Sequence, residues 1–82
     1  MSQKIYVGNL NYITDEVFLE KVFLRFGSIV SVKVIKDSET NTSKGYAFIE
    51  FEKEGEASKA VAGMNGRELD GRKINVSFAT SE

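Results

Sequence analysis

The chain has 82 residues, of which 41% are hydrophobic and 28% charged, which suits one small domain with a single core. Cysteine and histidine are both absent, which excludes disulfides, thiolate metal sites and the usual general base. We therefore expect no enzyme, cofactor or metal site. Eleven basic and twelve acidic residues leave a net charge of −1. This charge does not favour binding to duplex DNA, which depends on Lys and Arg contacts to phosphates.

The first part of the chain alternates strand and helix patterns. Residues 4–8 are rich in β-branched and aromatic residues, which predicts a strand. Thr14 is the expected N-cap of a helix, because two acidic residues follow it and favour the positive end of the helix dipole. Apolar residues then recur at helical spacing until Gly27, which predicts one buried stripe. The stripe consists of Leu19, Val22, Phe23 and Phe26.

The second part contains two further strands, a helix and a last strand. Residues 29–35 are rich in valine and isoleucine and predict a strand, after which Asn41 is expected to adopt a left-handed turn conformation. Residues 45–51 predict the next strand, residues 56–64 a helix, and residues 73–78 the last strand. The phenylalanines expected in the core are Phe23, Phe26, Phe51 and Phe78.

The predicted order is therefore β-α-β-β-α-β. Two split β-α-β units of this kind form a ferredoxin-like α+β sandwich, in which both helices cover one face of a four-stranded antiparallel sheet. We expect one domain over residues 1–82, with its core in residues 4–79. The first residues lack the apolar core of a secretion signal, and no apolar run is long enough to cross a membrane. We therefore expect an intracellular protein, in the nucleus or the cytoplasm.

Side-chain alternation places aromatic residues on the uncovered face of this sheet. If Phe51 points toward the helices, Tyr46 and Phe48 point away from them. The same rule turns Tyr6 outward on the first strand. A cluster of aromatic rings on an uncovered face is rare in a soluble domain that has no partner for it.

These residues lie in two sequence motifs. Residues 44–51, Lys-Gly-Tyr-Ala-Phe-Ile-Glu-Phe, resemble the octamer K/R-G-F/Y-G/A-F-V-x-F/Y of the RNA recognition motif, with Ile49 as the one departure. Residues 5–10, Ile-Tyr-Val-Gly-Asn-Leu, resemble the hexamer that lies on the family's first strand. The strand order and residues 69–74 also agree, so the resemblance covers residues 4–79. It implies a domain that binds single-stranded RNA on its open sheet.

The resemblance also implies how RNA is bound. Flat aromatic side chains cover the faces of unpaired bases, at about 1–3 kcal/mol per base. Lys44 is expected to hold a phosphate, and other residues of the same face to contact base edges or ribose. The expected RNA-binding residues are Tyr6, Tyr46, Phe48, Lys44, Lys33, Ile35, Lys4, Asn75 and Ser77. Backbone groups near Ala79 and Thr80 are further candidates in the family's pattern.

Some features leave alternatives open. Residues 37–43 carry no positive charge where the family often has Arg or Lys, so we expect binding that is weak and depends little on salt. Tyr12 can either wedge the loop after the first strand or contact RNA. The outer face of the first helix can serve a protein partner through three apolar residues. These are Val17, Phe18 and Leu24.

Two rival functions use the same fold. A protein-interaction module would hold a peptide on the sheet or on the first helix, but the outward aromatic residues argue against it. A small acylphosphatase-like hydrolase would need an anion-binding loop with arginine near the first strand, and residues 8–11 offer none. The preferred interpretation is a monomeric domain that binds short single-stranded RNA, with single-stranded DNA as a further ligand.

Overall fold

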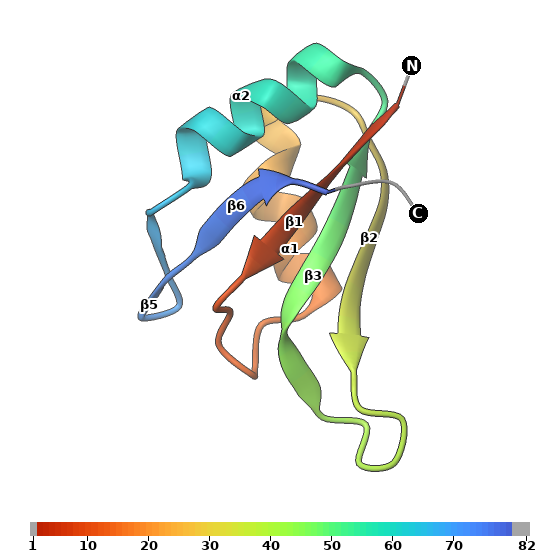
Figure 1. The fold of residues 1–82 in the computed structure, drawn as a ribbon, viewed down its shortest axis with the longest axis vertical. Helices are drawn as coiled ribbons and strands as arrows, with labels where there is room; N and C mark the ends of the chain where they lie inside the picture. The colour runs from red at the N-terminus through yellow and green to blue at the C-terminus, as the bar shows by residue number, and fades with distance from the viewer. Residues whose placement is uncertain (1, 80–82) are drawn as a thin grey trace.

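The computed structural model describes residues 2–79, and its elements follow the predicted order. They are β1 (Gln3–Gly8), α1 (Glu16–Phe23), the 3₁₀ turn η1 (Leu24–Phe26), β2 (Ile29–Lys36), β3 (Ser43–Phe51), α2 (Glu54–Met64), β4 (Glu68–Leu69), β5 (Arg72–Lys73) and β6 (Asn75–Phe78). One antiparallel sheet has the strand order β2-β3-β1-β6, while β4 and β5 pair separately. Figure 1 views this sheet with the helices packed against its rear face. The predicted α+β fold is confirmed.

The core lies between the helices and the rear face of the sheet. Alternate residues of the strands are buried there, as the period of two predicts. The helices contribute the apolar stripes expected from their spacing. The buried core residues of the sheet strands are Ile5, Val7, Val34, Ala47, Ile49, Phe51 and Val76, and those of the helices are Leu19, Phe23, Ala57, Ala60 and Met64. None of the helices in residues 2–79 is long and apolar enough to cross a membrane.

Helix α1 begins one residue later than the sequence pattern predicts. Asp15 is its N-cap, because the carboxylate of Asp15 accepts a hydrogen bond from the backbone N–H of Phe18 at 2.9 Å. Thr14 is buried instead, and its hydroxyl donates to the Asp70 carboxylate at 2.8 Å. The prediction of Thr14 as the cap was wrong. Threonine and aspartate can both cap a helix, so the local sequence does not distinguish Thr14 from Asp15. The hydrogen bond that engages Thr14 is made to Asp70, which is distant in sequence.

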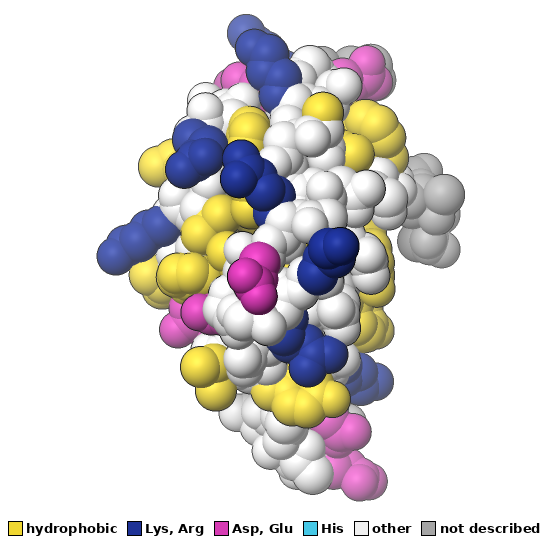
Figure 2. Space-filling model, turned by 90° about the vertical axis from the view of Figure 1, so that its left-hand side faces the viewer, with side chains coloured by type: hydrophobic (Ala, Val, Ile, Leu, Met, Phe, Trp, Pro, Cys, Tyr) yellow, Lys and Arg dark blue, Asp and Glu magenta, His cyan; other side chains and the backbone are white. Residues whose placement is uncertain are grey.

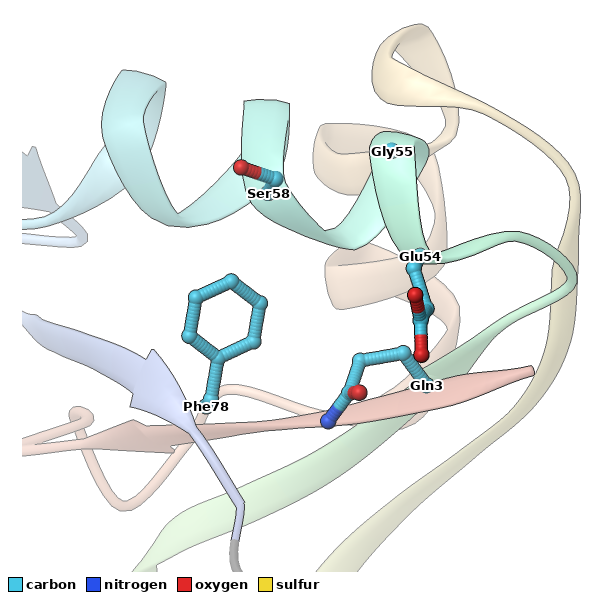
Figure 3. A pocket seen from close by; sticks show the side chains of 5 residues that line it. All are labelled: Gln3, Glu54, Gly55, Ser58 and Phe78. Atoms are coloured by element: carbon cyan, nitrogen blue, oxygen red, sulfur yellow. The ribbon is translucent and has the colours of Figure 1, made fainter. Parts of the chain in front are cut away.

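Phe78 lies on the helix side of the sheet, but it is not a core residue. It pairs with the buried Ile5, yet 49% of Phe78 is exposed because β6 is an edge strand. Figure 3 shows its ring directed toward α2, beside Ser58, in a hollow of about 480 Å³. Gln3 and Glu54 line the same hollow. The core prediction for Phe78 was wrong because a period of two sets the side of a residue and not its depth.

The predicted last strand is divided at Ile74. The backbone N–H of Ile74 donates to the carbonyl of Arg67 at 2.9 Å, so residues 72–73 pair with residues 68–69 and only β6 joins the main sheet. Helix α2 starts at Glu54, ahead of the predicted residue 56, and the Glu56 carboxylate accepts the backbone N–H of Lys53 at 3.3 Å. Asn41 has φ 59°, the left-handed conformation that the sequence predicts.

Candidate nucleic-acid interface

The sheet face opposite the helices carries no further layer within residues 2–79, and we call it the open face. The expected site residues lie on it in rows that cross the strands. Paired residues of neighbouring antiparallel strands have Cα atoms about 4.5–5.5 Å apart, so the side chains within a row adjoin. The central row crosses β2, β3, β1 and β6 through successive pairs. Its members are Lys33, Phe48, Tyr6 and Ser77.

The row on one side of this centre combines aromatic, apolar and amide groups. Gly8 on β1 pairs with the exposed Asn75 on β6. Tyr46 precedes Phe48 by two positions on β3, and Ile35 follows Lys33 by two positions on β2, so each pair shares the same face. The residues expected to stack and those expected to read base edges are therefore adjacent.

The row on the other side is charged. Lys4 on β1 pairs with Glu50 on β3, and Glu50 pairs with Ser31 on β2. Lys4 is exposed, whereas Glu50 is half-buried. Beside them, the backbone N–H of Ala79 donates to the carbonyl of Lys4 at 3.0 Å, so this candidate donor is already engaged. Thr80, the other candidate of this pair, lies outside the described residues.

Three aromatic rings form a cluster on the open face, the aromatic triad of Tyr6, Tyr46 and Phe48. The ring centroids of Tyr6 lie 5.8 Å from those of Tyr46 and Phe48, and the latter two lie 6.1 Å apart. The ring planes of Tyr6 and Tyr46 meet at 36°, those of Tyr6 and Phe48 at 60°, and those of Tyr46 and Phe48 at 88°. These distances are those of aromatic rings in contact, and each ring remains half-exposed. The triad is thus a cluster of adjoining aromatic rings on the open face.

The positive charges around the triad are few. Lys33 and Lys44 are exposed on β2 and β3, and Lys4 lies opposite Glu50. Figure 2 shows a different side of the molecule, the left-hand side of Figure 1, where Lys and Arg side chains lie among acidic and apolar ones.

The connection between β2 and β3 is acidic and held by its own hydrogen bonds. The Asp37 carboxylate accepts the backbone N–H groups of Glu39 at 2.8 Å and of Thr40 at 3.3 Å. These two hydrogen bonds hold the pKa of Asp37 below its ordinary value, because they favour the charged form. Asp37 is therefore ionised at neutral pH, so the connection carries two carboxylates, those of Asp37 and Glu39.

Gly45 shapes the start of β3, between Lys44 and the triad. Its φ of +89° lies in the region that favours glycine. The Gly45 carbonyl accepts the backbone N–H of Leu10 at 2.8 Å, which holds the loop after β1 against β3. The Tyr12 ring lies over Gly45, with Cε1 3.4 Å from the place of a Cβ atom, while 66% of Tyr12 is exposed. The Tyr12 ring thus contacts β3 at Gly45, and this contact does not decide between its two interpretations.

A polar tie between the end of β1 and the β4–β5 hairpin has no signal in the local sequence. Arg72 donates from Nη2 to Oδ1 of Asn9 at 2.7 Å and from Nε to the carbonyl of Asn9 at 3.3 Å. The Asn9 amide in turn donates to the carbonyl of Lys73 at 2.7 Å. Asn9 and Lys73 are 64 residues apart, and their bond holds the start of β6 beside Gly8. The tie therefore positions Asn75 next to the triad.

Comparison with known proteins identifies this arrangement. A family model of the RNA recognition motif matches residues 5–75, which include both sequence motifs and the whole triad. The chain belongs to the RNA recognition motif family.

Two curated relatives carry this RNA recognition motif within longer chains. Glycine-rich RNA-binding protein 2, mitochondrial, of Arabidopsis thaliana is 44% identical over 79 residues, which are 96% of this chain and 50% of that one. Glycine-rich RNA-binding protein 5, mitochondrial, of the same organism is also 44% identical over 79 residues, and the match covers 96% of this chain and 27% of the relative. This chain spans half or less of the length of these relatives.

Solved structures of RNA-binding proteins share the fold. RNA Binding Protein PG1 superimposes with a TM-score of 0.94 and 39% identity, over 98% of this chain and 96% of that chain. The Rna15 RRM with bound RNA (GU) gives a TM-score of 0.85 and 29% identity, over 95% of this chain and 83% of that one. Lys4, Ser77 and Ala79 lie outside the family match. The place of Lys4 and Ser77 on the motif rests on strand register, and that of Ala79 on its hydrogen bond to Lys4.

Two further expectations from the sequence concern the outer face of the first helix and metal binding. The outer face of α1 and the start of η1 expose the three apolar residues expected from the sequence, and Ile13 just before α1 is exposed as well. The three are Val17, Phe18 and Leu24. In residues 2–79, no three Cys, His, Asp or Glu side chains are grouped so that they could hold a metal ion.

Proposed function

We propose that this RNA recognition motif binds short single-stranded RNA on its open face, with the aromatic triad stacking on successive unpaired bases. The observation that carries the proposal is the triad itself, whose rings lie 5.8 to 6.1 Å apart and are half-exposed on an uncovered sheet. Removing such apolar surface from water favours association. Base–aromatic stacking contributes about 1–3 kcal/mol per base and tolerates every base.

The residues around the triad complete the proposed site. Lys44 and Lys33 are exposed next to it and pair with phosphates, and Lys4 adds a weaker contact because Glu50 faces it. Asn75 and Ser77 offer hydrogen bonds to ribose or base edges, and Ile35 offers apolar contact. Stacking does not sense the 2′-hydroxyl, so single-stranded DNA is a weaker ligand of the same face. One copy of the domain presents the entire row, so binding needs no second copy.

Competition between single strands and duplexes tests this mechanism. The bases of a duplex are stacked on one another and cannot lie on the triad, so single-stranded RNA should bind at least about tenfold more tightly than duplex RNA or DNA of the same sequence. Fluorescence anisotropy with a labelled single strand and unlabelled competitors measures this ratio. Equal competition by duplex would exclude stacking as the main source of affinity.

A protein contact on the outer face of α1 is a second candidate, favoured by the exposure of Val17, Phe18 and Leu24. The two functions use opposite sides of the domain and can be separated by one amide-shift titration. RNA should shift the resonances of β1 and β3 and leave α1 in place. A protein ligand of the helix should shift α1, and RNA-induced shifts confined to α1 would overturn the sheet as the RNA site.

A further inference from the structure

Gly8 lies on the open face, in contact with the triad. It occupies the extended end of β1 and pairs with Asn75, and its φ is outside the left-handed region in which Gly45 lies. The backbone at residue 8 therefore accepts any side chain. The space above Gly8 leaves no room for a side chain. A Cβ atom at residue 8 would meet Cε2 and Cζ of the Tyr6 ring at 2.7 Å, and the Tyr6 hydroxyl oxygen would lie closer still. The Tyr6 ring thus lies across Gly8.

We propose that Gly8 is a positioning residue for RNA binding: its missing side chain leaves the place in which the Tyr6 ring rests on the sheet. This inference rests on the proposed stacking function. With the ring across Gly8, one face of Tyr6 contacts the sheet and the other stays free for a base. The same placement brings the Tyr6 ring within 5.8 Å of Tyr46 and carries its hydroxyl into the row of Asn75.

The cost of a side chain at residue 8 should fall on binding and not on folding. The atoms that a Cβ would meet are at the far end of the Tyr6 side chain, which can rotate outward into solvent. Gly63 differs, because a Cβ there would meet the Phe26 ring, which packs against the core, at 2.8 Å. A displaced Tyr6 ring would have to return to its place before a base could stack on it, and the required free energy would weaken binding.

A double-mutant cycle tests whether Gly8 acts through Tyr6. Gly8→Ala should weaken the binding of a short single-stranded RNA by about 3- to 10-fold, and Tyr6→Ala by about 5- to 150-fold, the range expected for one stacked base. In the Tyr6→Ala background, Gly8→Ala should have no further effect. Gly55→Ala on α2 is the matched control, since a Cβ at residue 55 meets nothing within 4 Å, and it should leave the affinity unchanged.

The outcomes separate this inference from the function on which it rests. If Gly8→Ala binds RNA like the unchanged domain, or weakens binding equally with and without the Tyr6 ring, the positioning role is overturned. A Gly8→Ala domain that no longer melts cooperatively also overturns it, because the cost would then lie in the fold. If Tyr6→Ala itself binds normally, it is the stacking function that fails.

A measurement on the unsubstituted domain gives an independent check. The Tyr6 ring across Gly8 should shift the Gly8 Hα resonances by its ring current, and Tyr6→Ala should abolish this shift while the rest of the spectrum stays folded. Gly8 resonances that do not respond to Tyr6→Ala would overturn the proposed placement of the ring.

Discussion

The two faces of the sheet use the same residue types for opposite purposes. On β3, Phe51 points toward the helices and is fully buried, whereas Phe48, three residues earlier, points to the open face and is half-exposed. Phe51 belongs to a core that is close-packed on every side. Phe48 contacts Tyr6 and Tyr46 but no covering layer among the described residues. What distinguishes them is only which side of the strand each residue occupies.

This difference separates stability from binding within one strand. A side chain surrounded by the core contributes to the free energy of unfolding, and its loss leaves a cavity. A ring on the open face contributes less to folding, because part of its surface stays in water. The same free face can be covered by a base. Substitutions on the two faces should therefore affect different measurements, and each prediction below tests that separation.

The largest effect is expected on the buried face. Phe51→Ala should lower the free energy of unfolding by about 3–5 kcal/mol, the range for a phenylalanine lost from a core, as measured by urea denaturation. Phe78→Ala is the matched control on the same side of the sheet, and should cost clearly less because Phe78 is 49% exposed. Equal losses for the two variants would mean that burial depth does not determine how much a residue of this face contributes to the free energy of unfolding.

On the open face, Phe48→Ala should weaken the binding of single-stranded RNA by about 1–3 kcal/mol through the loss of one stacking surface. The thermal midpoint should change far less than in Phe51→Ala. Val17→Ala, which removes an exposed apolar side chain from α1, should leave the RNA affinity unchanged. A Phe48→Ala domain that unfolds but binds normally when folded would reverse the assignment of the two faces.

The separation of faces was predictable from the sequence, and the depth of its residues was not. Alternation along β1 and β3 is a local property of the sequence, so it suffices to place Tyr6, Tyr46 and Phe48 outward and Phe51 inward. The depth of Phe78 depends on how far α2 extends over an edge strand, and the N-cap at Asp15 depends on the remote bond of Thr14 to Asp70. Such features arise from contacts between segments that are distant in sequence.

A smaller effect is expected from the hydrogen-bonding groups beside the triad. Asn75→Ala should lower the affinity for single-stranded RNA by about 0.5–1.5 kcal/mol, the net contribution of one hydrogen bond. The affinity for a DNA strand of matched sequence should change less, because Asn75 is expected to contact the 2′-hydroxyl that DNA lacks. Parallel titrations with the two strands give the ratio, and an equal loss for both would assign Asn75 to the bases or the backbone.

The smallest effect concerns charge. Each phosphate contact with a single strand contributes about −0.7 to the slope of log affinity against log salt. The three lysines of the open face therefore predict a total slope no steeper than about −2. Lys44→Ala should flatten this slope by about 0.7, which is about a 2.5-fold difference between 50 and 200 mM salt, and should weaken all sequences alike. Lys59→Ala removes the same charge from α2, on the other side of the sheet, and should leave the slope unchanged. If Lys59→Ala flattens the slope as much as Lys44→Ala, the salt dependence comes from the domain's overall charge, and the phosphates are not held at the open face.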